Sequence, residues 1–321
     1  MSGCTDPSAE HSMMATETPG ILSGAGDSLV PSKETKALTE KPVEVKKKFA
    51  EDNEFYSYFQ DREEKFVVSD YCSRQPAVGA SKRASLVNWL IENKALFGMC
   101  IGQIFQAVKL FDFILSSAKE PLRRHDRNAL FIACAIVAAK FDDIENGFVV
   151  TDYECVRQWR IFDVKRVQKM EAVVLQSCRY DTRIPTAFNF LERHLNVAES
   201  DVLAFMLARY ILELSLLFGC FIPVPESLKA DAALALAMRI HGQPWDVFVK
   251  TQSSYNQDGI EEVMEGLNQM LRRRPKDLQK LQATQKRYSD EKYLNVASLG
   301  PLMSVLPLQA PVLVSPRKRL I

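Results

Sequence analysis

Residues 81–96, with the sequence SKRASLVNWLIENKAL, open a series of segments in which apolar side chains recur at helical spacing. About five such segments lie between Ser81 and Asp181, and a similar set begins after Pro185. The expected segments are 81–96, 102–118, 127–141, 151–160 and 165–178, then 186–195, 199–218, 226–240, 244–251 and 258–272. Strand signals, meaning alternation of period two bounded by turn dipeptides, are almost absent. We therefore predict an all-α fold made of two tandem five-helix units.

The two ends of the chain differ in composition from its middle. Residues 1–50 are rich in Ser, Thr, Pro, Gly, Glu and Lys and poor in aromatics, so we expect a disordered N-terminal arm. Beyond Asp52, the aromatic residues Phe55, Tyr58, Phe59 and Phe66 form a stripe typical of an amphipathic helix. The predicted domains are an arm over 1–50, the N-terminal helix and first unit over 51–181, a second unit over 182–299 and a flexible tail over 300–321.

Composition argues against several classes of protein. The 41 basic and 40 acidic side chains nearly cancel, so a nucleic-acid-binding role would need a local patch, and we expect no nucleic-acid partner. The seven cysteines stand singly, which favours a reducing compartment in which the thiols pack as small hydrophobes. The longest apolar stretch, Val202 to Val224, carries Arg209 and Glu213, which are costly in a bilayer. We interpret it as a core helix and expect no membrane span.

No residue constellation indicates catalysis. The four histidines, His11, His125, His194 and His241, lie far apart and outside any metal-binding motif, and we expect them at the surface or at helix caps. The adjacent Asp142 and Asp143 would point about 100° apart on a helix, unlike a facing acid/base pair. No Gly-rich loop follows a strand. We therefore predict a binding protein with no catalytic residue, cofactor or metal.

Four stretches carry a more specific pattern. They are DYCSRQP at 70–76 followed by KRASLVNWL at 82–90, AAKFDDI at 138–144, MEAVVL at 170–175 with YD at 180–181 and PT at 185–186, and YSDEKYLNVASL at 288–299. In this order and spacing they resemble the cyclin family, most closely its mitotic A and B types. The resemblance implies two stacked cyclin boxes with an N-terminal helix laid across the first. It also implies a regulatory subunit that binds and activates a cyclin-dependent kinase in a G2/M-like step of cell division.

The resemblance implies a kinase-binding site centred on Lys140 and Glu171. In the family, residues at these positions form a charged pair on adjacent helices and hydrogen-bond the backbone of the kinase. Val137, Phe141, Leu175 and Tyr180 stand where the family presents apolar surface to a mobile kinase helix, and Phe141 is the best placed to reach it. Ordinary core packing is the alternative for Val137 and Leu175. Lys140 near a helix C-terminus also suits a plain surface cation.

A second family site docks R-x-L motifs of substrates and inhibitors on an apolar patch. The residues at its positions are Lys82, Ser85, Leu86, Trp89, Glu92 and Asn128. Leu86, Trp89 and Glu92 match the family pattern. Lys82 and Ser85 place a cation and a hydroxyl where the family usually has Met and Ile, and Asn128 replaces a Gln. We predict weak or altered docking of R-x-L peptides, because two apolar contacts are lost.

Arg83 and Asn88 are expected to be structural. Asn88 stands at the position of a family aspartate that commonly pairs with the arginine matched by Arg83, so we expect Asn88 to accept a weaker hydrogen bond from Arg83.

Regulatory motifs lie mainly at the ends of the chain. No R-x-x-L destruction motif precedes Arg62, the first arginine. Ser315 before Pro316 fits a proline-directed phosphorylation site. The basic runs Lys46–Lys48 and Arg317–Arg319 fit nuclear import, although a solvated run of charge is the commoner meaning of such a pattern. We expect the protein in nucleus and cytoplasm.

Three other readings of the sequence stay open. They are a cyclin-fold transcription factor, a cyclin that serves transcription rather than division, and a helical scaffold that has lost kinase binding.

Overall fold

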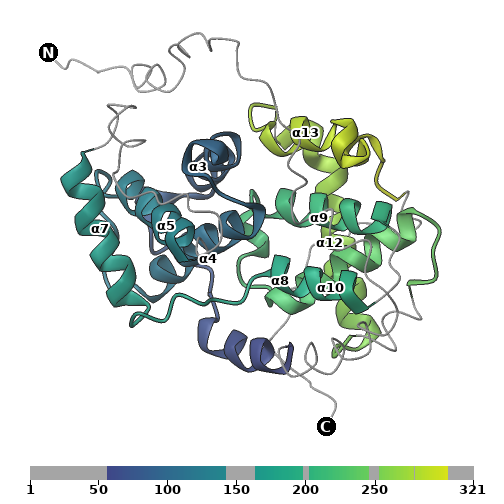
Figure 1. Cartoon of the computed structure of the whole chain (residues 1–321), viewed down its shortest axis with the longest axis horizontal. Coiled ribbons are helices and arrows are strands. Elements are labelled where there is room, and N and C mark those ends of the chain that lie inside the picture. Colours follow the sequence, from purple (N-terminus) through teal and green to yellow (C-terminus); the bar gives the residue numbers. More distant parts are fainter. Residues whose placement is uncertain (1–55, 142–162, 198–201, 246–252, 278, 303–321) are drawn as a thin grey trace, which may run out of the picture. The chain divides into compact units, whose positions relative to one another are not determined.

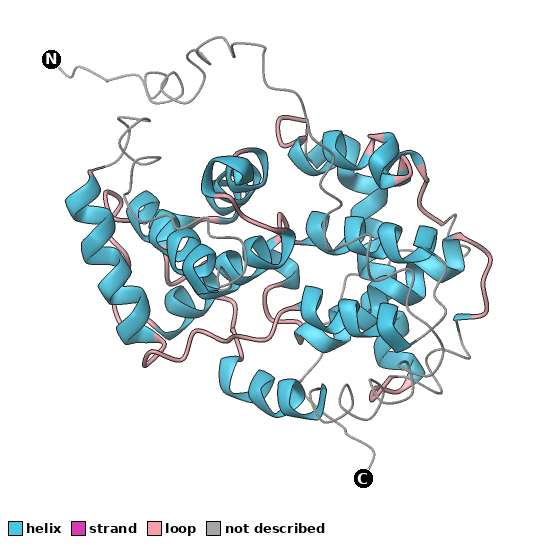
Figure 2. Ribbon diagram, in the orientation of Figure 1, coloured by secondary structure: helices cyan, strands magenta, loops and turns pink. Residues whose placement is uncertain are grey.

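The computed structural model describes residues 56–141, 163–197, 202–245, 253–277 and 279–302, and within these residues it contains helices and no strands (Figures 1 and 2). The all-α prediction is confirmed. The first unit contains α3 (Ala80–Glu92), α4 (Ile101–Ser117), α5 (Arg127–Phe141) and α7 (Val164–Ser177), and the second contains α8 (Ala187–Val197), α9 (Val202–Ser215), α10 (Glu226–Ile240), α12 (Gln257–Asp277) and α13 (Ala283–Tyr288). The short 3-10 turns are Glu64–Phe66, Pro76–Val78, Lys94–Phe97, Gly219–Phe221, Glu291–Tyr293 and Val296–Ser298.

Most predicted segments coincide with helices to within a few residues. The predicted segment 199–218 is shortened to α9, and 258–272 is lengthened to α12. The segment 151–160, most of 244–251, the N-terminal arm, and the tail beyond Leu302 with Ser315 lie outside the described residues.

Each unit is organised around one buried helix. Every residue of α5 from Ala129 to Ala139 is buried, and α4 and α7 pack against it. In the second unit every residue of α10 from Glu226 to Ala237 is buried among α8, α9 and α12. Both central helices are rich in Ala, so neighbouring helices approach closely. The buried part of α5 is entirely apolar, whereas that of α10 also carries Glu226, Ser227, Lys229 and Asp231.

Side-chain caps define where the surrounding helices begin. Cys100 is the N-cap of α4, and its backbone N–H donates to Oε1 of Gln103 at 2.8 Å. Asp163 caps α7 by accepting a hydrogen bond from the Lys165 N–H at 3.0 Å. These contacts satisfy backbone donors that have no partner within the helix.

A helix at residues 56–63 precedes the first unit, as the aromatic stripe predicts. Phe59 and Phe66 are buried, whereas Tyr58 is exposed. Glu63 accepts hydrogen bonds from the backbone N–H and the hydroxyl of Ser227, at 2.9 and 2.6 Å. The N-terminal helix is therefore bonded to α10 of the second unit through Ser227.

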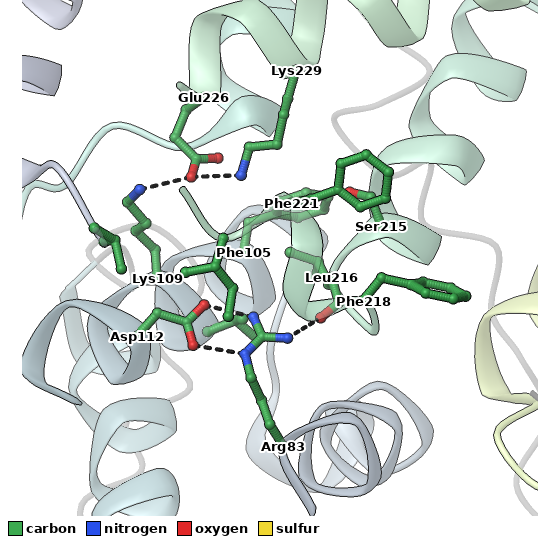
Figure 3. Close-up of a pocket in the computed structure, with 13 residues that line it drawn as sticks. Arg83, Phe105, Lys109, Asp112, Ser215, Leu216, Phe218, Phe221, Glu226 and Lys229 are labelled. Atoms are coloured by element: carbon green, nitrogen blue, oxygen red, sulfur yellow. Dashed lines mark hydrogen bonds and ion pairs between the residues drawn. The ribbon is translucent and has the colours of Figure 1, made fainter. Parts of the chain in front are cut away.

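Arg83 joins the two units, but not through the predicted partner. Its guanidinium forms a bidentate ion pair with Asp112 on α4, at 2.7 and 2.6 Å, and donates to the Leu216 carbonyl at 2.5 Å (Figure 3). Asn88 instead accepts a hydrogen bond from the Ala283 N–H at the start of α13, at 3.1 Å. The predicted Arg83–Asn88 contact is wrong because residues five apart on a helix point about 140° away from each other.

Beside Arg83 lies a buried charge cluster, which we call the junction cluster and define as Lys109, Glu226 and Lys229. Both ammonium groups lie 2.8 Å from Oε1 of Glu226 (Figure 3). Oε2 of the same carboxylate accepts from the Ala187 N–H at 2.9 Å. Burial alone would raise the pKa of Glu226, but Lys109 and Lys229 outweigh it and lower the pKa to about 2. The cluster ties α4 of the first unit to α8 and α10 of the second.

The polar residues of the long apolar stretch are buried, as expected for a core helix. Glu213 accepts from Arg287 Nη1 at 2.9 Å and from the Tyr288 hydroxyl at 3.1 Å. The Arg209 guanidinium lies 5.8 Å from the ring centroids of Phe188 and Tyr293. Among the described helices, none is long and apolar enough to cross a membrane.

One histidine differs from the prediction. His194 is buried, with Nε2 at 2.8 Å from Oδ1 of Asp231, so the expected surface or capping position is wrong for it. His125 is exposed and His241 follows the end of α10. His11 lies outside the described residues. The prediction for the cysteines is that most thiols are packed. Cys134 and Cys178 are buried, Cys72 is half-buried, and Cys100 and Cys220 are exposed.

Candidate partner-binding surface

Lys140 and Glu171 lie together on the outside of the first unit. The Lys140 ammonium, one residue before the end of α5, is 2.7 Å from Oε1 of Glu171 in the middle of α7. Gln103 of α4 donates to the Ala139 carbonyl at 3.2 Å and so holds the last turn of α5. The structure therefore has the charged pair that the family resemblance implies.

The exposure of this pair indicates what it contributes. The side chains of Lys140 and Glu171 are 37% and 13% exposed. An ion pair that water reaches contributes about 0–1 kcal/mol to folding. The fold therefore depends little on it, and both side chains lie within reach of a partner.

Apolar side chains flank the pair. Phe141 and Leu175 are half-buried, and Tyr180 is 73% exposed. Val137 is only 5% exposed, so ordinary core packing, the alternative kept open above, describes its state in the free chain. Helix α7 buries only Val167 and Val174, which leaves most of its length available to a partner. We call the group Val137, Lys140, Phe141, Glu171, Leu175 and Tyr180 the α5–α7 surface.

An unusual turn holds Tyr180 outward. Arg179 and Tyr180 both have left-handed backbone, with φ of 51° and 62°, although neither is Gly or Asn. The Tyr180 N–H donates to the Leu175 carbonyl at 2.8 Å, which closes the end of α7. Such a conformation costs free energy for a non-glycine residue and persists only where its surroundings enforce it.

Arg62 of the N-terminal helix provides that enforcement. Its guanidinium pairs with the Asp181 carboxylate and donates to the Arg183 carbonyl at 3.0 and 2.7 Å. Arg183 in turn lies with its guanidinium 5.7 Å from the centroid of the Phe141 ring. Arg62 and Arg183 were not among the predicted site residues, and no local pattern marks them, since Arg62 and Asp181 are 119 residues apart.

The residues at the positions of the predicted docking patch are only partly accessible. Lys82 and Glu92 are exposed, Trp89 is half-buried, and Leu86 is 6% exposed and belongs to the core. The polar replacements are satisfied internally. The Ser85 hydroxyl donates to the Ser81 carbonyl at 2.9 Å, and Oδ1 of Asn128 accepts from Arg127 Nε at 3.0 Å.

Within the described residues, no group of three or more His, Cys, Asp or Glu side chains is gathered as a metal site requires. Asp142 and Asp143 lie outside these residues.

Comparison with known proteins gives the same family for both units. Residues 54–183 match the family described as Cyclin, N-terminal domain, and residues 185–302 match Cyclin, C-terminal domain. The G2/mitotic-specific cyclin-B3 of Drosophila melanogaster is 28% identical over 78% of this chain and 44% of the relative. The cyclin-B3 of Homo sapiens is 30% identical over 80% of this chain and 18% of the relative. The chain therefore spans less than half the length of these two relatives.

A solved structure shares the fold. The viral cyclin from herpesvirus saimiri superimposes with a TM-score of 0.57 and 16% identity, over 67% of this chain and 95% of that one.

Proposed function

The chain belongs to the cyclin family, and on that premise we propose that it is a non-catalytic regulatory subunit that binds and activates a cyclin-dependent protein kinase. The relatives named above are G2/mitotic-specific cyclins, which supports a role in the division cycle at a G2/M-like step. The observation that carries the proposal is the Lys140–Glu171 pair, 2.7 Å apart and flanked by Phe141, Leu175 and Tyr180. We also propose residence in nucleus and cytoplasm, where such a kinase would meet its substrates.

The mechanism proposed is a shift in the population of kinase conformations. An active protein kinase needs an ion pair between a glutamate on its mobile helix and the lysine that holds the ATP phosphates. Phe141, Leu175 and Tyr180 of the α5–α7 surface would pack against that helix. Lys140 and Glu171 would hydrogen-bond backbone groups beside it. The kinase is activated to the extent that this surface binds the active conformer better than the inactive one.

The geometry favours a partner role for the pair over an internal one. A pair that water still reaches adds little to the fold, yet once a partner covers it, both charges lose water and their hydrogen bonds strengthen. Removing one member would then leave the other buried in the complex without this ion pair, at a cost of about 2–5 kcal/mol in affinity.

The test is recovery of cyclin-dependent kinases on the immobilised chain, with histone-kinase activity measured on the beads. Wild type is compared with Lys140→Ala, Glu171→Ala and the control Lys286→Ala, an exposed lysine on α13. We expect activity with wild type and the control, and its loss with both pair variants. Recovery of no kinase by wild type would overturn the proposal. Equal kinase activity with wild type, both pair variants and the control would mean that the kinase binds elsewhere on the chain.

A further inference from the structure

Basic side chains gather at the end of α5 opposite to Lys140. We define the basic surface as Arg123, Arg124, Arg127, Lys165, Arg166 and Lys169. It lies where the loop before α5 meets the first turns of α7, and the two helices pack side by side (Figure 1). Arg166 joins the two segments, because its Nη1 donates to the His125 carbonyl at 3.5 Å and its Nε lies 3.5 Å from Asp126.

Carboxylates balance only part of this charge. Residues 119–127 and 163–169 together hold seven Lys and Arg against three Asp and Glu. Of the three carboxylates, Asp126 makes only distant contacts, at 3.5 Å to Arg166 and 3.4 Å to His125. Asp163 caps α7, and Glu120 is exposed. In the described part of the chain, no carboxylate pairs with the four exposed cations Arg123, Arg124, Lys165 and Lys169.

The cations also stand where helix dipoles oppose them. Arg127 is the first residue of α5, and Lys165 and Arg166 lie in the first turn of α7. The N-terminus of a helix carries partial positive charge, so cations there are destabilising and anions are stabilising.

Arg127 is the member of the basic surface whose charge is least favourably surrounded. It is half-buried, and its hydrogen bonds go to two neutral acceptors, the Ala77 carbonyl and Oδ1 of Asn128, each at 3.0 Å. Burial and the neighbouring charge of Arg124 both lower the pKa of its guanidinium. Within the described ranges no carboxylate pairs with Arg127, so an anion brought by a partner would stabilise this cation.

We propose that the basic surface docks a phosphorylated segment of a partner protein. Four of its six cations are arginines, whose planar donors bind the oxygens of a phosphate dianion two at a time. The surface is local and the whole chain has a net charge of only +1, which favours a short anionic peptide over the extended backbone of a nucleic acid. This site lies apart from the α5–α7 surface and goes beyond the proposed kinase activation.

The neighbouring position on α3 has the same character. Lys82 is an exposed cation at the start of α3, the helix that follows Ala77. Asn128 accepts a hydrogen bond from Arg127 of the basic surface, and Lys82 adds one more exposed cation on the helix that follows Ala77.

The experiment measures binding of a short fluorescent peptide with two phosphoserines in a Gly/Ser background, titrated with the full chain. The competitors are the unphosphorylated peptide and a single-stranded oligonucleotide of equal charge. The variant Arg124→Glu with Lys165→Glu reverses two exposed cations of the surface. The control, Lys280→Glu with Lys286→Glu, changes the net charge equally at exposed lysines elsewhere.

We expect the phosphopeptide to bind and the unphosphorylated peptide not to bind. Its affinity should fall about tenfold or more in the Arg124/Lys165 variant and much less in the control. An equal loss of phosphopeptide affinity in both variants would mean that the attraction is non-specific and would overturn the proposal. Tighter binding of the oligonucleotide than of the phosphopeptide would indicate a nucleic-acid site and would overturn it too. Helical circular dichroism and a melting temperature no lower than that of wild type establish that the variants fold. The assay contains no kinase, so its result is independent of the proposed function.

Discussion

Lys–Glu contacts of nearly equal length lie in very different surroundings at two places in the molecule. Lys140 and Glu171 are 2.7 Å apart at the surface, whereas Lys109 and Lys229 each lie 2.8 Å from Glu226 in the interior. In the junction cluster water cannot replace a lost partner, so each charge depends on the others. At the surface water can, so that pair is available to a second protein. Burial, and not distance, decides whether a charged contact supports the fold or a complex.

The comparison is tested most strongly by removing the shared carboxylate. Glu226→Ala would leave two buried ammonium groups without their counter-ion, and we expect the free energy of unfolding to fall by about 3–5 kcal/mol. The matched variant Glu171→Ala should cost about 1 kcal/mol or less. Urea denaturation of both measures the difference. Similar losses would mean that the two contacts do not differ in the way their burial indicates.

The contribution of ionised Glu226 to stability should also appear in the pH dependence of the free energy of unfolding. The folded-state pKa of Glu226 is lowered to about 2 from an ordinary value of 4.5, so its stabilisation is fully present above pH 4.5 and is lost as the pH falls toward 2. Wild type should exceed Glu226→Gln in stability at neutral pH by about 3 kcal/mol, and the gap should narrow through this window. Chemical denaturation of both proteins at several acidic pH values tests it. A constant gap would contradict the ionised state of Glu226.

Arg62 should give an intermediate effect, since the side chain of Arg62 is 10% exposed and that of Asp181 is 47% exposed. Arg62→Ala removes the restraint on the left-handed turn, and we expect a loss of about 1–2 kcal/mol in stability together with weaker kinase recovery. Arg62→Lys keeps the charge but loses the forked geometry, so it should recover only part of the effect. If kinase recovery is unchanged in Arg62→Ala, the turn does not position Tyr180 for the partner.

The smallest effect is expected for Lys140→Ala in the isolated chain. Its melting temperature should stay close to that of wild type, because the pair contributes about 0–1 kcal/mol. Differential scanning calorimetry measures this. A large destabilisation would assign the pair to the fold and would weaken its use as evidence for partner binding.

The local sequence pattern was sufficient to predict the helices. It was not sufficient to predict most contacts between them. The segment 127–141 predicts α5 to the residue, because a continuous apolar run between charged ends leaves little choice. The partner of Arg83 could not be predicted, because Asp112 lies on another helix and belongs to no motif in the sequence. Helix periodicity alone should have excluded Asn88.

Position within a family motif predicted more of the candidate site than chemistry did. The contact between Lys140 and Glu171 was expected only through the resemblance. The two residues lie on different helices, so no helical spacing in the sequence relates them. His194 was misplaced because a polar aromatic side chain suits a cap as well as a buried contact, and Asp231 lies 37 residues away. No feature of the sequence predicts the left-handed backbone at Arg179 and Tyr180, because neither residue type favours that conformation.

The buried middle of α5 sets a fixed distance on the outside of the molecule. Its interior combines Ala with larger apolar residues and is packed on all sides. A larger side chain at an Ala would overpack the core, and a smaller one at Leu130 or Phe131 would leave a cavity, so little can be altered there. Change is tolerated at the two ends, where Arg127 and Lys140 lie about 20 Å apart at the rise of an α-helix. A ligand that engaged both ends would need a linker of at least that span, and its second contact would benefit from a high effective concentration.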